Sequence, residues 1–189
     1  MSKPHVLIFP YPAQGHILPL LDLTHQLVLQ GLSITIIITP KNLPLLHRLH
    51  PVAIQNLILP FPSHPKIPPS VKNVREIRIA GKYSMINALS KLQDPIIQWF
   101  KSHPSPPVAV ISDFFLGCAL DISRHLGIPR IVFYSSGAFL TSVNNFCWQN
   151  YEAIKDQTVA EFPVTPRMLS FNQEHLPSIC FTIEFGESR

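Results

Sequence analysis

The sequence predicts an α/β fold built on a doubly wound parallel sheet, and three features of the chain support this prediction. Five short apolar runs alternate with segments of helical periodicity, in the order β-α-β-α-β-α-β-α-β-α. The runs are almost uniformly apolar, as expected of strands that are buried on both faces of a sheet. With 189 residues and 46% hydrophobic content, the chain is long enough to bury a core around such a sheet.

The first three strands share a high content of aliphatic and β-branched residues and end at turns or prolines. They are expected at Val6–Phe9, Leu32–Thr39 and Ile54–Leu59. Helices are expected between them at 17–30 and 45–49, with Gly31 suited to end the first of the two. The third strand leads into a proline-dense loop, residues 60–69, which is too stiff for a helix and too long for a tight turn. We therefore interpret this loop as a candidate binding loop.

The second half of the chain continues the same alternation. Two helices are expected first, at 74–94 and 95–101, with Pro95 placed in the opening turn of the second. The remaining elements alternate strand and helix, and they are expected at 108–112, 116–126, 130–134 and 138–156. The pattern weakens after Asp156, although residues 162–166 are compatible with a further strand.

The charge of the chain does not point to a nucleic-acid partner. The formal net charge is +4, and four basic residues form a stripe at near-helical spacing. They are Lys72, Arg75, Arg78 and Lys82. No aromatic side chains interleave with the stripe, as a single-strand binder requires, so a solvated helix face is the better interpretation.

Cysteine spacing and hydropathy indicate where in the cell the protein is expected. The three cysteines lie far apart with no Cys-x-x-Cys pair, which predicts neither a disulfide framework nor a zinc site. Pro10 and Pro12 interrupt the N-terminal apolar run, and no apolar segment reaches membrane length. We therefore expect a cytoplasmic protein without membrane insertion.

Three polar side chains follow the ends of predicted strands: His16, Asp113 and Ser135. The carboxyl ends of parallel strands meet at one edge of the sheet, so these residues are expected to line one crevice. A histidine beside a buried carboxylate can take a proton from a bound hydroxyl, while the carboxylate orients the ring and stabilises the imidazolium. From spacing alone, a packing role for His16 and a helix-capping role for Asp113 stay equally open.

Other kinds of catalytic or binding site receive less support from the sequence. A hydrolase using Ser135 with His16 is a weaker hypothesis, because the serine lacks the Gly-x-Ser-x-Gly pattern. Gly15 stands alone rather than in Gly-x-Gly-x-x-Gly, which argues against a dinucleotide site. His47 and His50 have i, i+3 spacing, but no third ligand is evident, so no metal site is expected.

Three motifs stand out in the chain: the opening segment 5–23, the segment 110–138 and the stretch 172–179. Together and in this order, they resemble plant UDP-sugar-dependent glycosyltransferases of family 1, in particular the branch that glycosylates flavonoids and related phenolics. The resemblance implies that residues 1–179 form a Rossmann-like, acceptor-binding N-terminal domain of a GT-B fold. Residues 180–189 do not resemble the family and are expected to be an atypical tail. The family's donor-binding box is not found, so a C-terminal UDP-sugar-binding domain is expected to be absent.

The resemblance also implies roles for the residues of the crevice. His16 matches the base that deprotonates the acceptor hydroxyl, and Asp113 matches its carboxylate partner. Ser135 and the backbone around Gly15 match positions that contact the sugar and phosphates of the donor. The implied reaction is an inverting transfer of a hexosyl group from a UDP-sugar to a hydroxyl of a small phenolic acceptor. It needs no metal or other cofactor, and a monomer is expected.

Candidate acceptor-binding residues are Met85, Phe139 and Phe146, of which Phe146 also fits a core position at helical spacing. The alternative to a working acceptor domain is a truncated, catalytically inactive fragment that at most binds a small molecule. Either way, the isolated chain is expected not to hold UDP-sugar.

Overall fold

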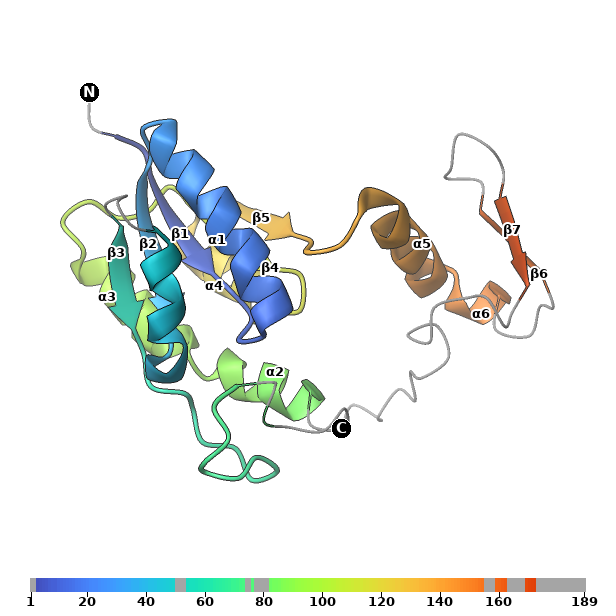
Figure 1. Ribbon diagram of the computed structural model, residues 1–189, viewed down its shortest axis with the longest axis horizontal. Coiled ribbons are helices and arrows are strands. Elements are labelled where there is room, and N and C mark those ends of the chain that lie inside the picture. Colours follow the sequence, from blue (N-terminus) through green and yellow to red (C-terminus); the bar gives the residue numbers. More distant parts are fainter. Residues whose placement is uncertain are drawn as a thin grey trace. The chain divides into compact units, whose positions relative to one another are not determined.

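The computed structural model describes residues 3–49, 54–73, 76, 82–154, 159–162 and 169–172. The chain divides into two compact units, residues 1–135 and 136–189 (Figure 1). The expected boundary at residue 179 and the expected tail at 180–189 lie outside the described residues. Both predictions about the domain organisation therefore stay predictions.

The first unit contains a five-stranded parallel sheet with the order β3-β2-β1-β4-β5. Its strands are β1 (His5–Phe9), β2 (Ser33–Ile38), β3 (Gln55–Ile58), β4 (Ala109–Asp113) and β5 (Arg130–Phe133). The chain moves outward from β1 to β3, then crosses to the other side of β1 for β4 and β5. The order of the strands therefore reverses between β1 and β4, where doubly wound sheets place their ligands. This confirms the predicted α/β fold class.

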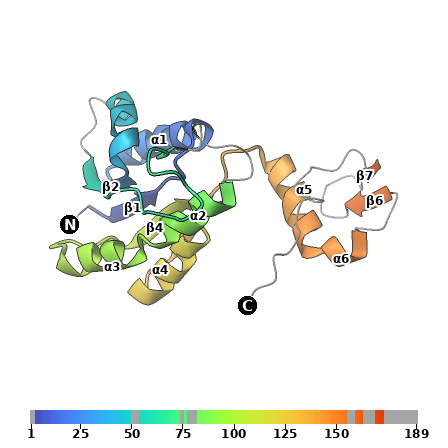
Figure 2. The same ribbon diagram turned by 90° about the horizontal axis from the view of Figure 1, so that it is seen from below.

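Helices cover both faces of this sheet (Figures 1 and 2). They are α1 (Gln14–Leu29), the 3-10 helix η1 (Pro40–Leu49), α2 (Lys82–Ser90), α3 (Gln93–Ser102) and α4 (Cys118–Leu126). Figure 2 shows α1 on one side of the sheet and α3 and α4 on the other. The right-handed crossovers expected of parallel strands place successive helices in this way.

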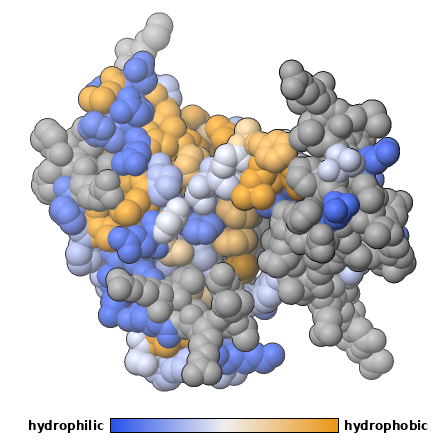
Figure 3. Space-filling view, turned by 45° about the vertical axis from the view of Figure 1, so that its right-hand side comes forward, coloured by the Kyte–Doolittle hydropathy of each residue, from blue (hydrophilic) through white to orange (hydrophobic). Residues whose placement is uncertain are grey.

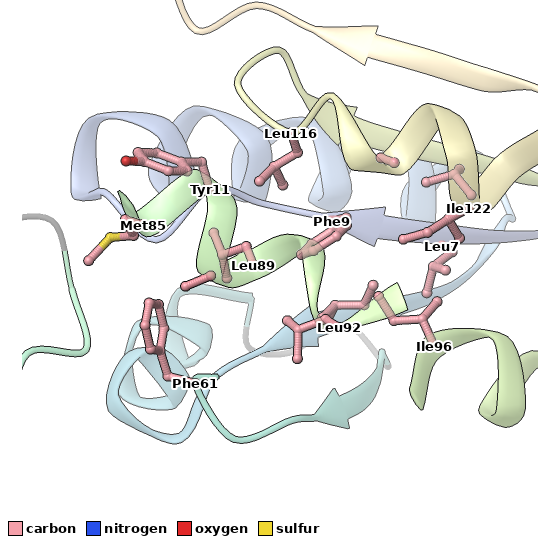
Figure 4. Close-up of a cluster of buried hydrophobic side chains, with 14 of the residues drawn as sticks. Leu7, Phe9, Tyr11, Phe61, Met85, Leu89, Leu92, Ile96, Leu116 and Ile122 are labelled. Carbon is pink, nitrogen blue, oxygen red and sulfur yellow. The ribbon is translucent and has the colours of Figure 1, made fainter. Parts of the chain in front are cut away.

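Alternating residues of β1 build the two cores. Val6 and Ile8 belong to the cluster that packs against α1, whereas Leu7 and Phe9 belong to the cluster formed with α2, α3 and α4. Side chains of a strand alternate between its two faces, so an all-apolar strand supplies both cores at once. Figure 4 shows the second cluster, with Met85 at one end between Tyr11 and Phe61. Each fully buried side chain of this size contributes about 1.5–3 kcal/mol to folding.

Several element ends differ from the sequence-based expectations. Helix α1 begins at Gln14 rather than Ile17, because the amides of His16 and Ile17 already bond to the carbonyl of Ala13 at 2.9 and 2.8 Å. The expected helix at 45–49 is a 3-10 helix that starts at Pro40. Gly31 ends α1 with φ of +89°, as predicted.

The later helices also differ in their limits. Of the helix expected at 74–94, the structure describes α2 at Lys82–Ser90, and α3 starts two residues before Pro95. Gly127 closes α4 with φ of +67°. The arginines of the predicted basic stripe and the side chain of Lys82 lie outside the described residues.

The second unit contains helices and a small sheet. Helix α5 (Ala138–Gln149) and the short α6 (Tyr151–Ile154) replace the single helix expected at 138–156, with Asn150 between them. Strands β6 (Val159–Phe162) and β7 (Leu169–Asn172) pair antiparallel, with Glu161 opposite Ser170. The strand suggested at 162–166 therefore begins earlier, at Val159.

Some apolar side chains of the first unit are exposed. Ile131 and Val132 of the edge strand β5 are 52% and 38% exposed. Figure 3 shows hydrophobic residues at the surface among hydrophilic ones. A charged content of only 14% agrees with this surface. In the part of the chain that the structure describes, no helix combines the length and hydrophobicity needed to cross a membrane.

Candidate active site

The ends of three neighbouring strands bring His16, Asp113 and Ser135 together. His16 lies in the first turn of α1, directly after β1, and Asp113 is the last residue of β4. Ser135 follows β5 by two residues. Since β4 pairs with both β1 and β5, all three residues lie at the same edge of the sheet. The geometric expectation from the sequence is met, while the roles of these residues stay predictions.

His16 and Asp113 form a hydrogen-bonded pair. Nδ1 of His16 lies 2.8 Å from Oδ2 of Asp113. The Asp113 side chain is fully buried, whereas the His16 side chain is 20% exposed. The second carboxylate oxygen, Oδ1, accepts a hydrogen bond of 2.9 Å from the backbone N–H of Phe115. Both oxygens of Asp113 are thus occupied, which fixes the carboxylate and, through it, the plane of the imidazole.

The carboxylate also decides which ring nitrogen of His16 is available. A carboxylate only accepts, so Nδ1 of His16 carries the hydrogen, and Nε2 of the neutral ring holds the lone pair. The hydroxyl of Ser135 lies 3.4 Å from the same Nδ1. The Ser135 hydroxyl therefore lies next to the nitrogen that already carries a hydrogen, and not next to Nε2, which could accept its proton. This geometry does not favour the hydrolase hypothesis.

Aromatic rings surround the imidazole. The His16 ring contacts Tyr11, Phe114 and Phe115 at centroid distances of 5.4, 5.6 and 5.0 Å. Tyr134 in turn stacks on Phe114 at 5.0 Å. Burial, together with the charge of Asp113, raises the pKa of Tyr11 to about 12, so its phenol stays protonated at neutral pH. An apolar surrounding strengthens the electrostatic coupling between the imidazole and the carboxylate.

The sequence reasoning missed this aromatic shell. Phe114 and Phe115 come directly after Asp113, and Tyr134 comes directly before Ser135. Their position beside two predicted site residues was the available signal. These residues lie directly past the carboxyl ends of β4 and β5, at the edge of the sheet where the site forms, so they were candidates as well.

Arg130 stabilises the carboxyl end of β4. Its Nε donates to Oγ of Ser112 at 2.8 Å, and its Nη2 donates to the backbone carbonyl of Asp113 at 3.3 Å. Burial lowers the pKa of this arginine below its ordinary value. A guanidinium remains charged in proteins, so it adds a positive charge near the buried carboxylate.

The remaining predicted site residues lie in different surroundings. A Cβ atom placed on Gly15 would meet no heavy atom within 4 Å, so the space beside the first turn of α1 is open. Met85 is fully buried in the core, which gives it a packing position instead of an exposed one. Phe139, 53% exposed, and Phe146 lie on α5 in the second unit.

No metal centre is found among the described residues, where no three His, Cys, Asp or Glu side chains gather closely enough to hold an ion. The ring of His47 bonds to the backbone carbonyl of Pro44. His50 lies outside the described residues.

Comparisons with known proteins identify the family. UDP-glycosyltransferase 89A2 of Arabidopsis thaliana is 48% identical over 181 residues, which cover 94% of this chain and 39% of the relative. Flavonol 3-O-glucosyltransferase UGT89B1 of the same plant is 46% identical, covering 98% of this chain and 40% of the relative. No protein-family model matches the chain.

Comparisons with solved structures point to the same family. The crystal structure of Arabidopsis thaliana UGT89C1 complexed with UDP-L-rhamnose has a TM-score of 0.71 at 34% identity, covering 82% of this chain and 41% of the other. The crystal structure of the same enzyme complexed with quercetin has a TM-score of 0.71 at 37% identity, and the match covers 75% of this chain and 37% of the other. The chain spans about two fifths of the length of its curated relatives. By sequence and by its GT-B-type Rossmann-like fold, the chain belongs to the plant UDP-glycosyltransferases.

Proposed function

We propose that this chain supplies the acceptor-binding and proton-abstracting part of a glycosyltransferase. The enzyme would move a hexosyl group from a UDP-sugar to a hydroxyl of a small phenolic acceptor. The observation that carries the proposal is the 2.8 Å pair between His16 and the buried Asp113, at the edge where the strand order reverses. The names of the relatives support the acceptor class, since they include a flavonol 3-O-glucosyltransferase and a flavonol 7-O-rhamnosyltransferase.

The proposed mechanism starts at Nε2 of His16. The acceptor O–H donates its proton to Nε2 while the oxygen attacks the anomeric carbon of the sugar. A new carbon–oxygen bond forms on one face, and the bond to UDP breaks on the other, so the configuration inverts. UDP leaves with the bonding electrons. Asp113 stabilises the imidazolium, whose Nδ1–H already points at Oδ2, until the proton passes to solvent.

The surrounding residues have supporting roles in this proposal. Phe114, Phe115 and Tyr11 hold the imidazole plane and limit the access of water to it. The hydroxyl of Ser135 and the open space beside Gly15 would face the sugar and phosphates of the donor. No metal takes part. We also propose that the protein is a cytoplasmic monomer, in keeping with three cysteines that lie far apart in the sequence without a Cys-x-x-Cys pair.

We further propose that these 189 residues bind the acceptor without transferring sugar on their own. The support is the missing donor-binding box within this sequence and the two-fifths coverage of the relatives. Phe139 and Phe146 of α5 are kept as proposed acceptor-binding residues of the second unit.

Titration calorimetry on the chain with quercetin and with UDP-glucose tests the proposal. Binding of quercetin together with no measurable binding of UDP-glucose is the expected result. Failure to bind quercetin contradicts the acceptor role. Transfer of glucose from UDP-glucose to quercetin by the purified chain contradicts the proposed dependence on further sequence.

A further inference from the structure

A cavity lies within the proline-dense loop, residues 60–69, that follows β3. Its volume is about 380 Å³, within the usual range for small-molecule pockets. Four prolines of the loop contribute to its walls, together with the ring of Phe61, the imidazole of His64 and two lysines, Lys72 and Lys91. None of the residues of the candidate active site lines it.

The walls of this cavity are fixed to the body of the first unit. Phe61 and Ile67 are only 8% and 6% exposed and belong to the core cluster that contains Leu89. The backbone N–H of Ile67 donates to the carbonyl of His64 at 3.0 Å, which closes a turn across the loop. Nζ of Lys91, just after α2, donates to the carbonyl of Ser63 at 2.8 Å. Proline rings restrict the remaining backbone freedom, so the cavity is preformed.

The cavity carries positive charge that no carboxylate neutralises among the described residues. Nζ of Lys72 lies 5.5 Å from the centroid of the Phe61 ring, and neither Lys72 nor Lys91 has a described carboxylate within ion-pair distance. The carboxylate of Glu76 has other partners than the two ammonium groups of the cavity. It accepts hydrogen bonds from the backbone N–H groups of Lys72 and Asn73, and it forms an ion pair with Lys41 at 3.0 Å.

The histidine of the cavity adds a hydrogen-bond donor. Nδ1 of His64 accepts from the backbone N–H of Lys66 at 3.2 Å. In the neutral ring the hydrogen therefore lies on Nε2. The cavity thus combines two ammonium groups and an imidazole N–H with a wall of proline and phenylalanine rings. Such a set complements an anion attached to a flat apolar body.

We propose that this cavity is a second binding site, for a small aromatic carboxylate of the size of a hydroxycinnamate. The carboxylate lies between the ammonium groups of Lys72 and Lys91, and the ring lies on the prolines and Phe61. This site does not depend on the proposed glycosyl transfer, because it uses none of the residues around His16.

The test uses the full chain and 4-hydroxycinnamate as the probe. Titration calorimetry gives the affinity, and amide chemical shifts in ¹⁵N-labelled protein locate the ligand. We expect shifts at Ser63, Lys66 and Ile67. Replacing Lys72→Met or Lys91→Gln weakens binding about three- to fivefold each, as expected for partly exposed charge pairs. Lys91→Gln retains a donor that can reach toward the Ser63 carbonyl, so it separates loss of charge from loss of loop structure.

Matched controls isolate the charge effect. Lys101→Met removes an exposed lysine in the last turn of α3, outside the cavity, and leaves the affinity unchanged. The methyl ester of the probe binds more weakly than the acid, and higher salt weakens only the acid. Quercetin, which has no carboxylate, keeps its affinity in the Lys72 and Lys91 variants, so failure here is distinguishable from failure of the acceptor proposal.

Three outcomes overturn the proposal. One is a set of amide shifts confined to His16, Phe114 and their neighbours, which would place the acid in the candidate active site. Another is equal binding of acid and ester with no effect of either lysine substitution. The third is inorganic phosphate competing at the same concentration as the acid, which would reduce the site to a simple anion site.

Discussion

Two histidines at opposite ends of β1 have opposite surroundings. His5, the first residue of the strand, is 3% exposed, and both of its ring nitrogens bond to the protein. Nδ1 lies 2.6 Å from the carbonyl of Ser105, and Nε2 lies 2.8 Å from the hydroxyl of Thr35. His16, just past the other end, has protein hydrogen-bond partners only at Nδ1 among the described residues. Its Nε2 is thus available to a substrate.

The position in the sheet therefore decides the surroundings of each histidine: His5 is enclosed by the protein, whereas His16 is 20% exposed. The amino ends of the strands are covered by connectors, and His5 contacts the rings of Trp99 and His103 there, at 6.3 and 5.0 Å. Burial lowers the pKa of His5 below 6.5, the nearby His103 lowers it further, and the bond to Ser105 acts in the opposite direction. His5 is therefore held neutral inside the protein.

The largest expected effect is a loss of activity on substitution of His16, which the matching substitution of His5 should not cause. For this test the chain is fused to the remaining three fifths of the flavonol 3-O-glucosyltransferase UGT89B1, and glucosylation of quercetin is measured. His16→Ala should lower kcat about 10²- to 10⁴-fold, since it removes the general base. His5→Gln should leave kcat within about threefold, because it lies outside the site. Equal losses in both variants would contradict the assignment of His16 as the base.

Asp113→Asn should have the next largest effect on the same fusion, a loss of about 10²-fold in kcat, at the lower end of what general base catalysis contributes. An amide can still accept from the N–H of Phe115, but it no longer stabilises an imidazolium at Nδ1. The KM for quercetin should change little, since the carboxylate does not contact the acceptor. A loss confined to KM would indicate that Asp113 acts only by packing.

The pH dependence of stability should report on His5. Its pKa is lowered by folding, so the unfolded chain binds more protons, and stability is lost as the pH falls through 6.5 toward the folded value. In His5→Gln the free energy of unfolding should depend less on pH below 6.5 than in the parent chain. Urea denaturation at pH 7.5 and pH 5.5 measures the difference. Identical pH dependence in both proteins would contradict a buried neutral His5.

Ser135→Ala should have the smallest effect, a loss of about three- to tenfold in kcat of the fusion. One hydrogen bond to the donor is removed, and such bonds contribute about 0.5–1.5 kcal/mol. A generic ester assay on the same variant serves as the control for a serine hydrolase. Esterase activity that disappears with Ser135→Ala would revive the hydrolase hypothesis.

Much of the site was predictable because it follows local patterns. The ends of the five strands of the parallel sheet could be located to within one residue, and the strand-to-helix positions of His16 and Asp113 followed from them. Met85 could not be placed in this way. Its helical segment gave no sign of which side faces the core, and in the structure it is fully buried beside Tyr11 and Phe61.

Three features follow from local sequence alone: the alternation of strands and helices, the glycine turn at Gly31, and the family to which the chain belongs. These features depend on local periodicity and on motifs, which are properties of neighbouring residues. Only the tertiary structure decided that β4 lies beside β1, which places Asp113 within 2.8 Å of a residue 97 positions away. Strand order depends on how the sheet buries both of its faces at once, and no local segment contains that information.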